Sequence, residues 1–343
     1  MMKKSLIALA IAAAAPAAFA ATSNVEISGK IAMDVQSVSG IADKDASSDG
    51  KGFHANNNNS VITVAGNEDL GGGMKAFFSL SYGLPMTSAG ALSGQNQIVG
   101  LEGGFGKVFA GAFDNPTKVI GRGVDLFGDQ SAGDARYLTS VGVSDARAND
   151  VVAYISPSMS GAQLVLAHAN QNTGGAADAG RINIVKLTYA NGPLSVAVSH
   201  DKTDNAASSD GADAKTLRAT GSYKMGDTRL VALYQTADNT SGAASTDSKT
   251  WGVGAAHAMG PITLKAQYYA YDLKNSANDA KMTAVGMDYS LSKRTTLQVA
   301  YSKVSNDGTA TLGGSAAVAG SDALTIAAGE DPARFSIGMK HTF

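Results

Sequence analysis

The chain has 343 residues and contains no cysteine. Disulfide bonds and thiolate metal sites are therefore excluded, and we expect no metal ion. The chain also lacks a basic surplus, because 27 Lys and Arg residues stand against 29 Asp and Glu residues. This balance gives no electrostatic reason to expect nucleic acid as a partner. The 40 glycines form no phosphate-binding loop and no nucleophile elbow, so we expect no cofactor and no enzymatic activity.

The sequence also lacks an apolar run long enough for a transmembrane helix. The stretch Leu6–Ala15 is shorter than the roughly 20 residues that a bilayer requires. It follows two lysines and precedes the small-x-small triplet Ala18-Phe19-Ala20, so residues 1–20 have the order of a cleaved export signal. Lipid leaves no partner for unpaired backbone groups, so an exported membrane protein without helices must close into a barrel. We predict that residues 21–343 form one such β-barrel.

Aromatic residues are sparse, at 6% of the chain, but their placement is regular. A ring residue followed at once by a tight turn recurs at intervals of 32 to 35 residues, at Tyr154, Tyr189, Tyr223, His257 and Tyr289. Each turn is followed by a run that alternates apolar with polar or small residues, then a loop, then another alternating run. A period of two indicates a strand, so the repeat predicts hairpins and not stacked helical pairs.

The two faces of the alternating runs differ in chemistry. In Thr216–Tyr223, Leu217 and Tyr223 lie on one side and Arg218 lies on the other. Long charged side chains such as Arg218 and Lys265 could not be buried in a small soluble core without partners. We therefore predict that the apolar face contacts lipid and that the polar face lines a lumen.

Short turns divide most of the chain into seven strand pairs, which is 7 × 2 = 14 strands. The runs Val25–Val35 and Phe335–Phe343 add two more, and pairing between them would close the sheet. The predicted fold is all-β, a 16-stranded antiparallel transmembrane β-barrel. A barrel of about 16 strands leaves an aqueous channel inside, so this architecture implies passage.

Four segments, in order along the chain, resemble elements of the Gram-negative general porins of the beta-proteobacterial type. These are Asn67–Ala76 at the first short turn, Arg147–Gly161, Tyr289–Leu297, and the ending Lys340–Phe343. The resemblance implies a homotrimer in the bacterial outer membrane through which ions and small hydrophilic solutes diffuse passively. It also implies contacts with outer-membrane lipid and lipopolysaccharide, and recognition of Phe343 by the barrel-assembly machinery.

Tyrosines at the short turns are predicted to form an aromatic girdle at the membrane interface, where an apolar ring with a polar tip is favoured. The predicted girdle consists of Tyr154, Tyr189, Tyr223 and Tyr289.

The stretch of about 114–149 is the longest without a hairpin turn of its own. By the resemblance it is the third external loop, which folds inward and narrows the channel. Charges at a narrow throat filter ions, because a low-dielectric constriction strengthens their field. The candidate constriction charges are Arg122, Asp125, Asp129, Asp134, Arg136 and Arg147. Alternation assigns five further charges to the lumen: Lys30, Asp34, Lys75, Arg218 and Lys265.

The chain departs from the family at positions that decide selectivity. Anion-preferring members carry arginines where this sequence has Val61, Gln95 and Ala112, and only Arg147 keeps its match. Inherited anion selectivity is therefore in doubt, and the sequence leaves open a weak selectivity or a preference for cations.

Three other interpretations are open. A plugged or narrow barrel would act as a substrate-specific channel or an adhesin, but no segment suggests a plug domain. An enzymatic barrel would need a histidine base, whereas His168, His200, His257 and His341 fall on predicted apolar faces near strand ends. The acidic run Asp43–Gly50 lacks the alternating ligand spacing of a calcium loop, so a solvated external loop is the better interpretation.

Overall fold

The computed structural model describes residues 23–41, 53–140, 144–170, 180–204, 213–239, 247–314 and 324–343. The predicted export signal and the run Asp43–Gly50 lie outside the described residues. The described strands are β1 (Ser23–Ser39), β2 (Phe53–Asn57), β3 (Val61–Gly71), β4 (Met74–Gly83), β5 (Ser93–Gly103), β6 (Gly106–Asp114), β7 (Arg147–Ile155), β8 (Ala162–Asn170), β9 (Arg181–Asn191), β10 (Leu194–Asp204), β11 (Ala214–Met225), β12 (Thr228–Asn239), β13 (Ser248–Met259), β14 (Ile262–Leu273), β15 (Ala280–Ser290), β16 (Thr295–Asn306) and β17 (Ala333–Thr342). Two helices, α2 (Pro116–Arg122) and α3 (Arg136–Thr139), lie between β6 and β7.

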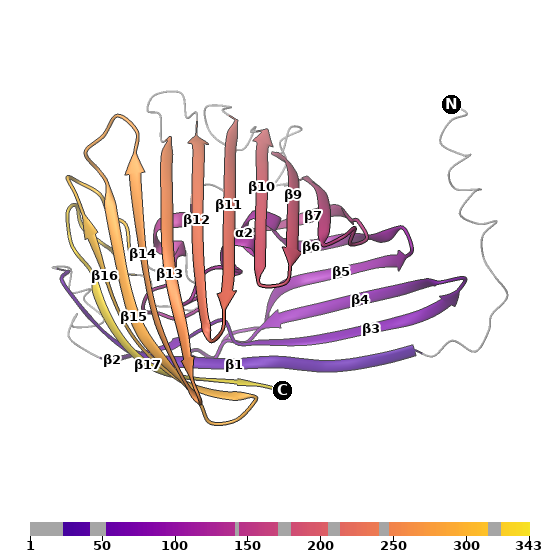
Figure 1. Cartoon of the computed structure of the whole chain (residues 1–343), viewed down its shortest axis with the longest axis horizontal. Coiled ribbons are helices and arrows are strands. Elements are labelled where there is room, and N and C mark those ends of the chain that lie inside the picture. The colour runs from indigo at the N-terminus through magenta and orange to yellow at the C-terminus, as the bar shows by residue number, and fades with distance from the viewer. Residues whose placement is uncertain are drawn as a thin grey trace.

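The strands form one closed antiparallel sheet. From β3 to β17 each strand pairs with the next, and β1 joins the two ends (Figure 1). Its residues 30–39 pair with β17 and its residues 23–30 pair with β3. β2 also pairs with β1, so β2 and β3 are two halves of one strand position. The 17 assigned strands thus occupy 17 − 1 = 16 positions, and the predicted barrel is confirmed.

The break between β2 and β3 spans residues 58–60. Asn59 has a φ of 57°, in the left-handed region that ordinary strand residues avoid. The Ser60 hydroxyl bridges the gap, because it accepts from the N–H of Ala32 and donates to its carbonyl, at 3.0 Å each. The break therefore bends the strand without leaving its neighbour unpaired.

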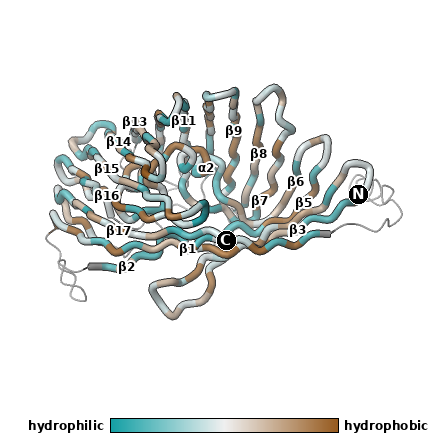
Figure 2. The backbone as a smooth tube through the Cα atoms, turned by 60° about the horizontal axis from the view of Figure 1, so that its bottom comes forward, coloured by the Kyte–Doolittle hydropathy of each residue, from teal (hydrophilic) through white to brown (hydrophobic). Residues whose placement is uncertain are grey.

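Alternation between the two faces of the sheet follows the predicted pattern. In β11, Leu217 is exposed while Thr216 and Arg218 are buried. The first residues of β9 reverse this chemistry, because Arg181 and Asn183 are exposed while Ile182 and Ile184 are buried. Figure 2 shows the same alternation as bands of hydrophobic and hydrophilic residues along the strands. The exposed face is rich in aliphatic side chains such as Val99, which is 63% exposed. An outer face that leaves valine uncovered in this way suits contact with lipid.

Tight turns join the strands at one end of the barrel. Their glycines adopt positive φ, for example 58° at Gly226 and 60° at Gly260, a conformation that a residue with a Cβ rarely adopts. These two turns lie just after Tyr223 and His257, where the repeat of a ring residue and a tight turn predicts them. The opposite end carries the longer connections.

The seam between the first and last strands is held by Phe343. Its backbone N–H donates to the Gly29 carbonyl at 3.1 Å and its carbonyl accepts from the Gly29 N–H at 3.0 Å. The aromatic ring lies over Gly29, where an added Cβ would lie 2.5 Å from Phe343 Cζ. The absence of a side chain at Gly29 therefore makes room for this ring.

The inner face is not uniformly polar. On β6 to β9 it carries a buried apolar cluster that includes Phe109, Val151, Ile182 and Ile184. From β10 onward it also buries polar side chains, which are Ser199, Asp201, Thr216, Arg218 and Gln235. A second buried apolar cluster on β12 to β16 includes Leu233, Tyr269 and Met282. Helix α2 lies inside the barrel near the polar side chains of β10 and β11 (Figure 1). Among the described residues, no helix is long and apolar enough to cross a membrane.

Candidate channel constriction

The segment between β6 and β7 folds into the barrel interior, as predicted for a constriction loop. We call the described residues of this segment, 115–140 and 144–146, the inner loop. Its outgoing limb contains α2, its tip lies near residues 127–133, and its returning limb contains α3 and leads to Arg147 at the start of β7. The loop contacts inward-facing side chains of β1 and of β10 to β17, and Asn59 in the break between β2 and β3.

The outgoing limb begins with a capped helical turn. The Asn115 side chain accepts from the Thr117 N–H at 2.8 Å, and Pro116 occupies the first helical position. Both features favour helix initiation. The Thr117 hydroxyl then meets the Ser199 hydroxyl of β10 at 2.7 Å. The helix is thus fixed against the barrel wall at its start.

The tip of the inner loop is bound to β1. Asp34 of β1 accepts from the Ser131 hydroxyl at 2.7 Å and from the Ser131 N–H at 3.1 Å. Nearby, the ammonium of Lys30 lies 2.9 Å from Asp129. Asp34 is buried and also accepts from Asn56 and Asn58. The predicted lumen-facing Asp34 is therefore a buried anchor for the loop tip.

The wall strand β14 makes a second set of contacts with the tip. The Gln267 amide donates to the carbonyl of Gly133 at 2.6 Å and accepts from the Leu126 N–H at 3.1 Å. Lys265 pairs with Asp288 at 2.8 Å, and its ammonium lies 4.6 Å from the centre of the Phe127 ring. Phe127 has no solvent exposure and packs against small residues, which are Ala132, Ala284 and Ala300.

A compact charge cluster holds the tip together. Arg122 contacts the carboxylates of Asp125, Asp129 and Asp134, and Arg136 contacts Asp129 and Asp134. Burial alone would raise the pKa of Asp134, but Arg122 and Arg136 outweigh it, and the pKa of that carboxyl is lowered. The same balance lowers the pKa of Asp129, through Arg122 and Lys30.

Asp125 behaves differently from the other two acids in this cluster. Burial and the adjacent negative charge of Asp134 raise its pKa from 3.8 to about 6, although Arg122 acts in the opposite direction. Its oxygens accept from the N–H groups of Phe127 and Ala135 at 3.0 Å each. Asp125 is thus a buried carboxyl of the inner loop whose raised pKa is about 6.

A second charge group lies at the base of the loop. Asp114, the last residue of β6, lies 2.8 Å from Lys118 and 3.1 Å from Arg147. Asn96 on β5 accepts from Arg147 at 3.2 Å and donates to Asp114 at 3.2 Å. One carboxylate here faces two cations.

Solvent access separates the charges of the loop into two classes. The side chains of Asp125 and Asp134 are 1% and 0% exposed. By contrast, the side chains of four cations keep 16–24% exposure, and these are Lys30, Lys118, Arg122 and Arg147. Only Asp114 and Asp129, at 20% each, are comparably accessible among the acids of these two groups. The loop therefore buries more negative than positive charge.

The other predicted charges occupy different places. Arg218 and Lys265 lie on the inner face but are buried beneath the inner loop. Lys75 lies at the short-turn end beside Glu102 and Lys107, where these residues help to line a hollow of about 270 Å³. Arg136, predicted to face the channel, is also buried.

At the three positions where the family's anion-preferring members carry arginine, the wall has no charge. Gln95 donates to the Asn59 side chain at 2.8 Å, and Asn59 donates to Asp129 at 3.5 Å. Ala112 of β6 pairs with Gln97, and Val61 opens β3. The side-chain amides of Gln95 and Asn59 thus connect the barrel wall to Asp129 at the loop tip.

The four tyrosines predicted to form a girdle lie next to the short turns. Tyr223 and Tyr289 are exposed, and the Tyr154 hydroxyl donates to the Phe105 carbonyl of the neighbouring turn at 2.8 Å. A second set of exposed rings, on the long-loop half of the barrel, was missed: Tyr234, Trp251 and Tyr301. Trp251 packs against Tyr268, with 5.4 Å between the ring centroids and 51° between the ring planes. Alternation places all of them on the apolar face, so this second set could have been predicted.

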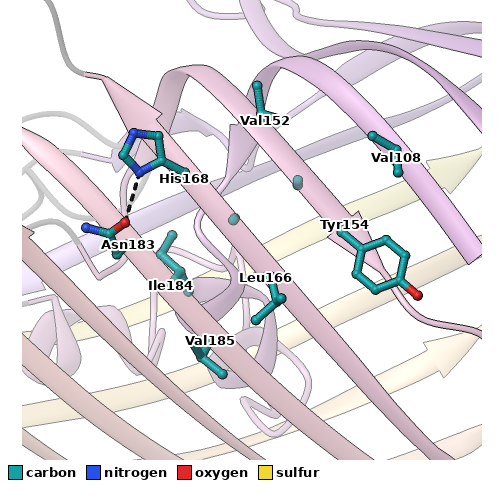
Figure 3. A pocket seen from close by; sticks show the side chains of 10 residues that line it. Val108, Val152, Tyr154, Leu166, His168, Asn183, Ile184 and Val185 are labelled. Atoms are coloured by element: carbon teal, nitrogen blue, oxygen red, sulfur yellow. Dashed lines mark hydrogen bonds between the residues drawn. The ribbon is translucent and has the colours of Figure 1, made fainter. Parts of the chain in front are cut away.

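The histidines do not gather into a catalytic group within the described residues. His168 lies on the outer face of β8 and hydrogen-bonds to Asn183 at 2.9 Å, beside a hollow of about 370 Å³ lined by Val152, Leu166 and Val185 (Figure 3). His257 and His341 bond to Thr228 and Thr295. No group of three potential metal ligands occurs in the part of the chain that the structure describes.

A closed antiparallel barrel with an apolar outer face and an inward-folded charged loop defines a membrane channel of the porin class. Comparison with known proteins agrees with this assignment. The family described as Gram-negative porin matches residues 7–309, and the chain belongs to this family. It is therefore an outer-membrane porin that forms a water-filled channel for passive diffusion.

Three similar proteins show how far the likeness extends. Outer membrane porin protein 32 of Delftia acidovorans is 31% identical over 358 residues, which cover 100% of both chains. The structure of the anion-selective porin from Comamonas acidovorans superposes with a TM-score of 0.82 at 26% identity, covering 94% of this chain and 100% of that one. OmpT of Vibrio cholerae in its trimer form, at 16% identity and a TM-score of 0.70, covers 94% and 99% and shares the fold.

Proposed function

We propose that this porin passes ions and small hydrophilic solutes with a modest preference for anions. The observation that carries the proposal is the unequal burial of charge around the inner loop. Four partly exposed cations, Lys30, Lys118, Arg122 and Arg147, face two partly exposed carboxylates, Asp114 and Asp129. Charges that keep solvent access at a constriction act on passing ions, whereas buried ion pairs largely cancel.

Two further points support a modest preference. The wall positions Val61, Gln95 and Ala112 carry no charge, so they add nothing to the field of the four cations. The structurally similar porin from Comamonas acidovorans is described as anion-selective. We infer weaker selectivity here than a wall of arginines would give.

The reversal potential in a planar bilayer under a KCl gradient tests this proposal. We expect chloride to be more permeant than potassium. Lys118→Gln and Arg147→Gln should shift the potential toward cations, and Asp114→Asn should shift it toward anions. Lys215→Gln removes a cation from the outer face of β11 and serves as the matched control, with no shift expected. A preference for potassium in the wild-type protein would refute the assignment of these charges to the throat.

We further propose that the porin assembles as a homotrimer. Family membership supports this, as does the trimer form of the structurally similar OmpT. The outer faces of β1 and β5 expose Val25, Ile27 and Val99 and can be covered by a neighbouring copy or by lipid. Conductance steps in groups of three, and a ladder of cross-linked species that ends at the trimer, are expected.

Contacts with lipopolysaccharide and with the assembly machinery belong to the same proposal. On the outer face, near the long-loop ends of β9, β13 and β15, lie the exposed cations Arg181, Lys249 and Lys281. Basic side chains at this height suit the phosphate groups of lipopolysaccharide. Phe343 is proposed as the recognition signal for assembly. We infer a channel without catalytic activity, since His168 points outward toward lipid.

A further inference from the structure

Arg218 is, with Arg334, one of the two largest fully buried side chains in the part of the chain that the structure describes. It projects from β11 with 0% exposure, although it carries a permanent charge. A buried guanidinium is costly unless it is paired and all its donors are used. The acceptors around the Arg218 guanidinium therefore indicate its structural role.

All five N–H donors of Arg218 have acceptors. Nε donates to Gln235 of β12 at 2.7 Å. Nη1 donates to the Thr117 carbonyl at 3.0 Å and to Asp145 at 2.8 Å. Nη2 donates to the Thr139 carbonyl at 3.1 Å and to the other oxygen of Asp145 at 2.9 Å. The planar fork of arginine matches this arrangement, with a two-point contact to the carboxylate.

These acceptors come from both limbs of the inner loop. Thr117 belongs to α2 on the outgoing limb, whereas Thr139 and Asp145 belong to the returning limb. Gln235 of β12 also connects the wall to the returning limb, because its side-chain amide donates to the Thr139 carbonyl at 3.0 Å. One side chain of the wall thus holds together two loop segments that are 22 to 28 residues apart in sequence.

The packing around the guanidinium leaves no spare room. A Cβ added to Gly121 of α2 would lie 2.4 Å from Arg218 Nη1. Gly121 therefore lets the helix approach the wall closely enough for the Thr117 carbonyl to reach Arg218. The position of α2, and with it that of Lys118 and Arg122, depends on this contact.

We propose that Arg218, with Asp145, is a positioning pair that clamps both limbs of the inner loop to the wall and thereby sets the width of the throat. The inference rests on the proposed function, in which this loop forms the constriction. Arg218 is not exposed to the channel, so it acts on solutes through the loop and not by direct contact.

The first test is the double variant Arg218→Gln/Asp145→Asn, which removes both charges and leaves no unpaired ion behind. Single-channel recordings should show the loss of one steady conductance level and its replacement by fluctuating levels. Liposome swelling with sugars of increasing size should show a larger exclusion limit. Lys215→Gln, on the opposite face of the same strand, should change neither readout. A role in barrel stability alone would lower the melting temperature without changing the conductance of folded channels.

A disulfide supplies the independent rescue. The chain has no cysteine, and the hydroxyls of Thr117 and Ser199 lie 2.7 Å apart. Thr117→Cys/Ser199→Cys should therefore cross-link α2 to β10. Added to the double variant, this bond should restore a steady conductance, and a reductant should abolish the rescue. If the double variant fails to assemble, Arg218→Lys replaces it, because a lysine keeps the charge but offers fewer donors in a different geometry.

The experiments distinguish failure of the proposed function from failure of the proposed clamp. Wild-type protein that forms no channel would refute the proposed function itself. Wild-type channels combined with folded Arg218 variants of unchanged conductance, noise and exclusion limit would overturn the clamp and leave the porin function intact.

Discussion

A single carboxyl of the inner loop gives the channel a pH dependence. The pKa of Asp125 is raised to about 6 by burial and by Asp134, against the opposing effect of Arg122, while Lys265 and Gln267 face it from β14. As the pH falls through this value, the loop loses one negative charge. We expect the reversal potential to move toward stronger anion preference between about pH 7 and 5.

The matched variant Asp125→Asn is neutral at every pH, so its reversal potential should not change over the same range. A wild-type potential that is flat from pH 7 to 5 would show that Asp125 does not titrate there. For stability the sign is fixed by the raised pKa. Between about pH 4 and 6 the folded state binds more protons than the unfolded chain, so the contribution of Asp125 decreases as the pH rises.

At the scale of one element, the inner loop depends on packing as well as on charge. Phe127 is fully buried against Ala284 and Ala300 of the wall. Phe127→Ala removes roughly 3–5 kcal/mol of such packing and leaves a cavity behind the loop tip. We expect increased current noise and faster proteolysis within the loop, measured on assembled protein. Phe105→Ala, in an exposed turn, is the control and should change neither.

The sequence predicts the strands better than it predicts the loop. Alternation is a local property, so it places Leu217 outside and Arg218 inside without knowledge of any other segment. What covers Arg218 is not local, because its partners Thr117 and Asp145 lie 101 and 73 positions away. For the same reason, Asp34 was expected to line the lumen but is buried by Ser131, 97 positions away. A face can be assigned from periodicity, whereas burial on that face depends on tertiary contacts.

At the scale of the whole molecule, the barrel depends on the seam between β1 and β17. Gly29→Ala would place a Cβ 2.5 Å from the Phe343 ring and 2.6 Å from the Val61 carbonyl. We expect this variant to assemble more slowly and to unfold at a lower temperature, measured by the gel shift between folded and heat-denatured protein. Gly221→Ala is the matched control, because its added Cβ would find its nearest neighbour, on Val196, at 3.9 Å. If the two variants assemble equally well, the contact between the Phe343 ring and Gly29 is not required for assembly.

The contacts of the inner loop also have a mechanical meaning. A hollow tube of hydrogen-bonded strands can be flattened by sideways pressure, because only the angles between neighbouring strands need to change. Here the loop runs across the inside and is fastened to Asp34 of β1, to Gln267 of β14 and to Arg218 of β11. It therefore acts as an internal brace, and the cross-section of the channel should stay round when the surrounding bilayer is stretched or compressed.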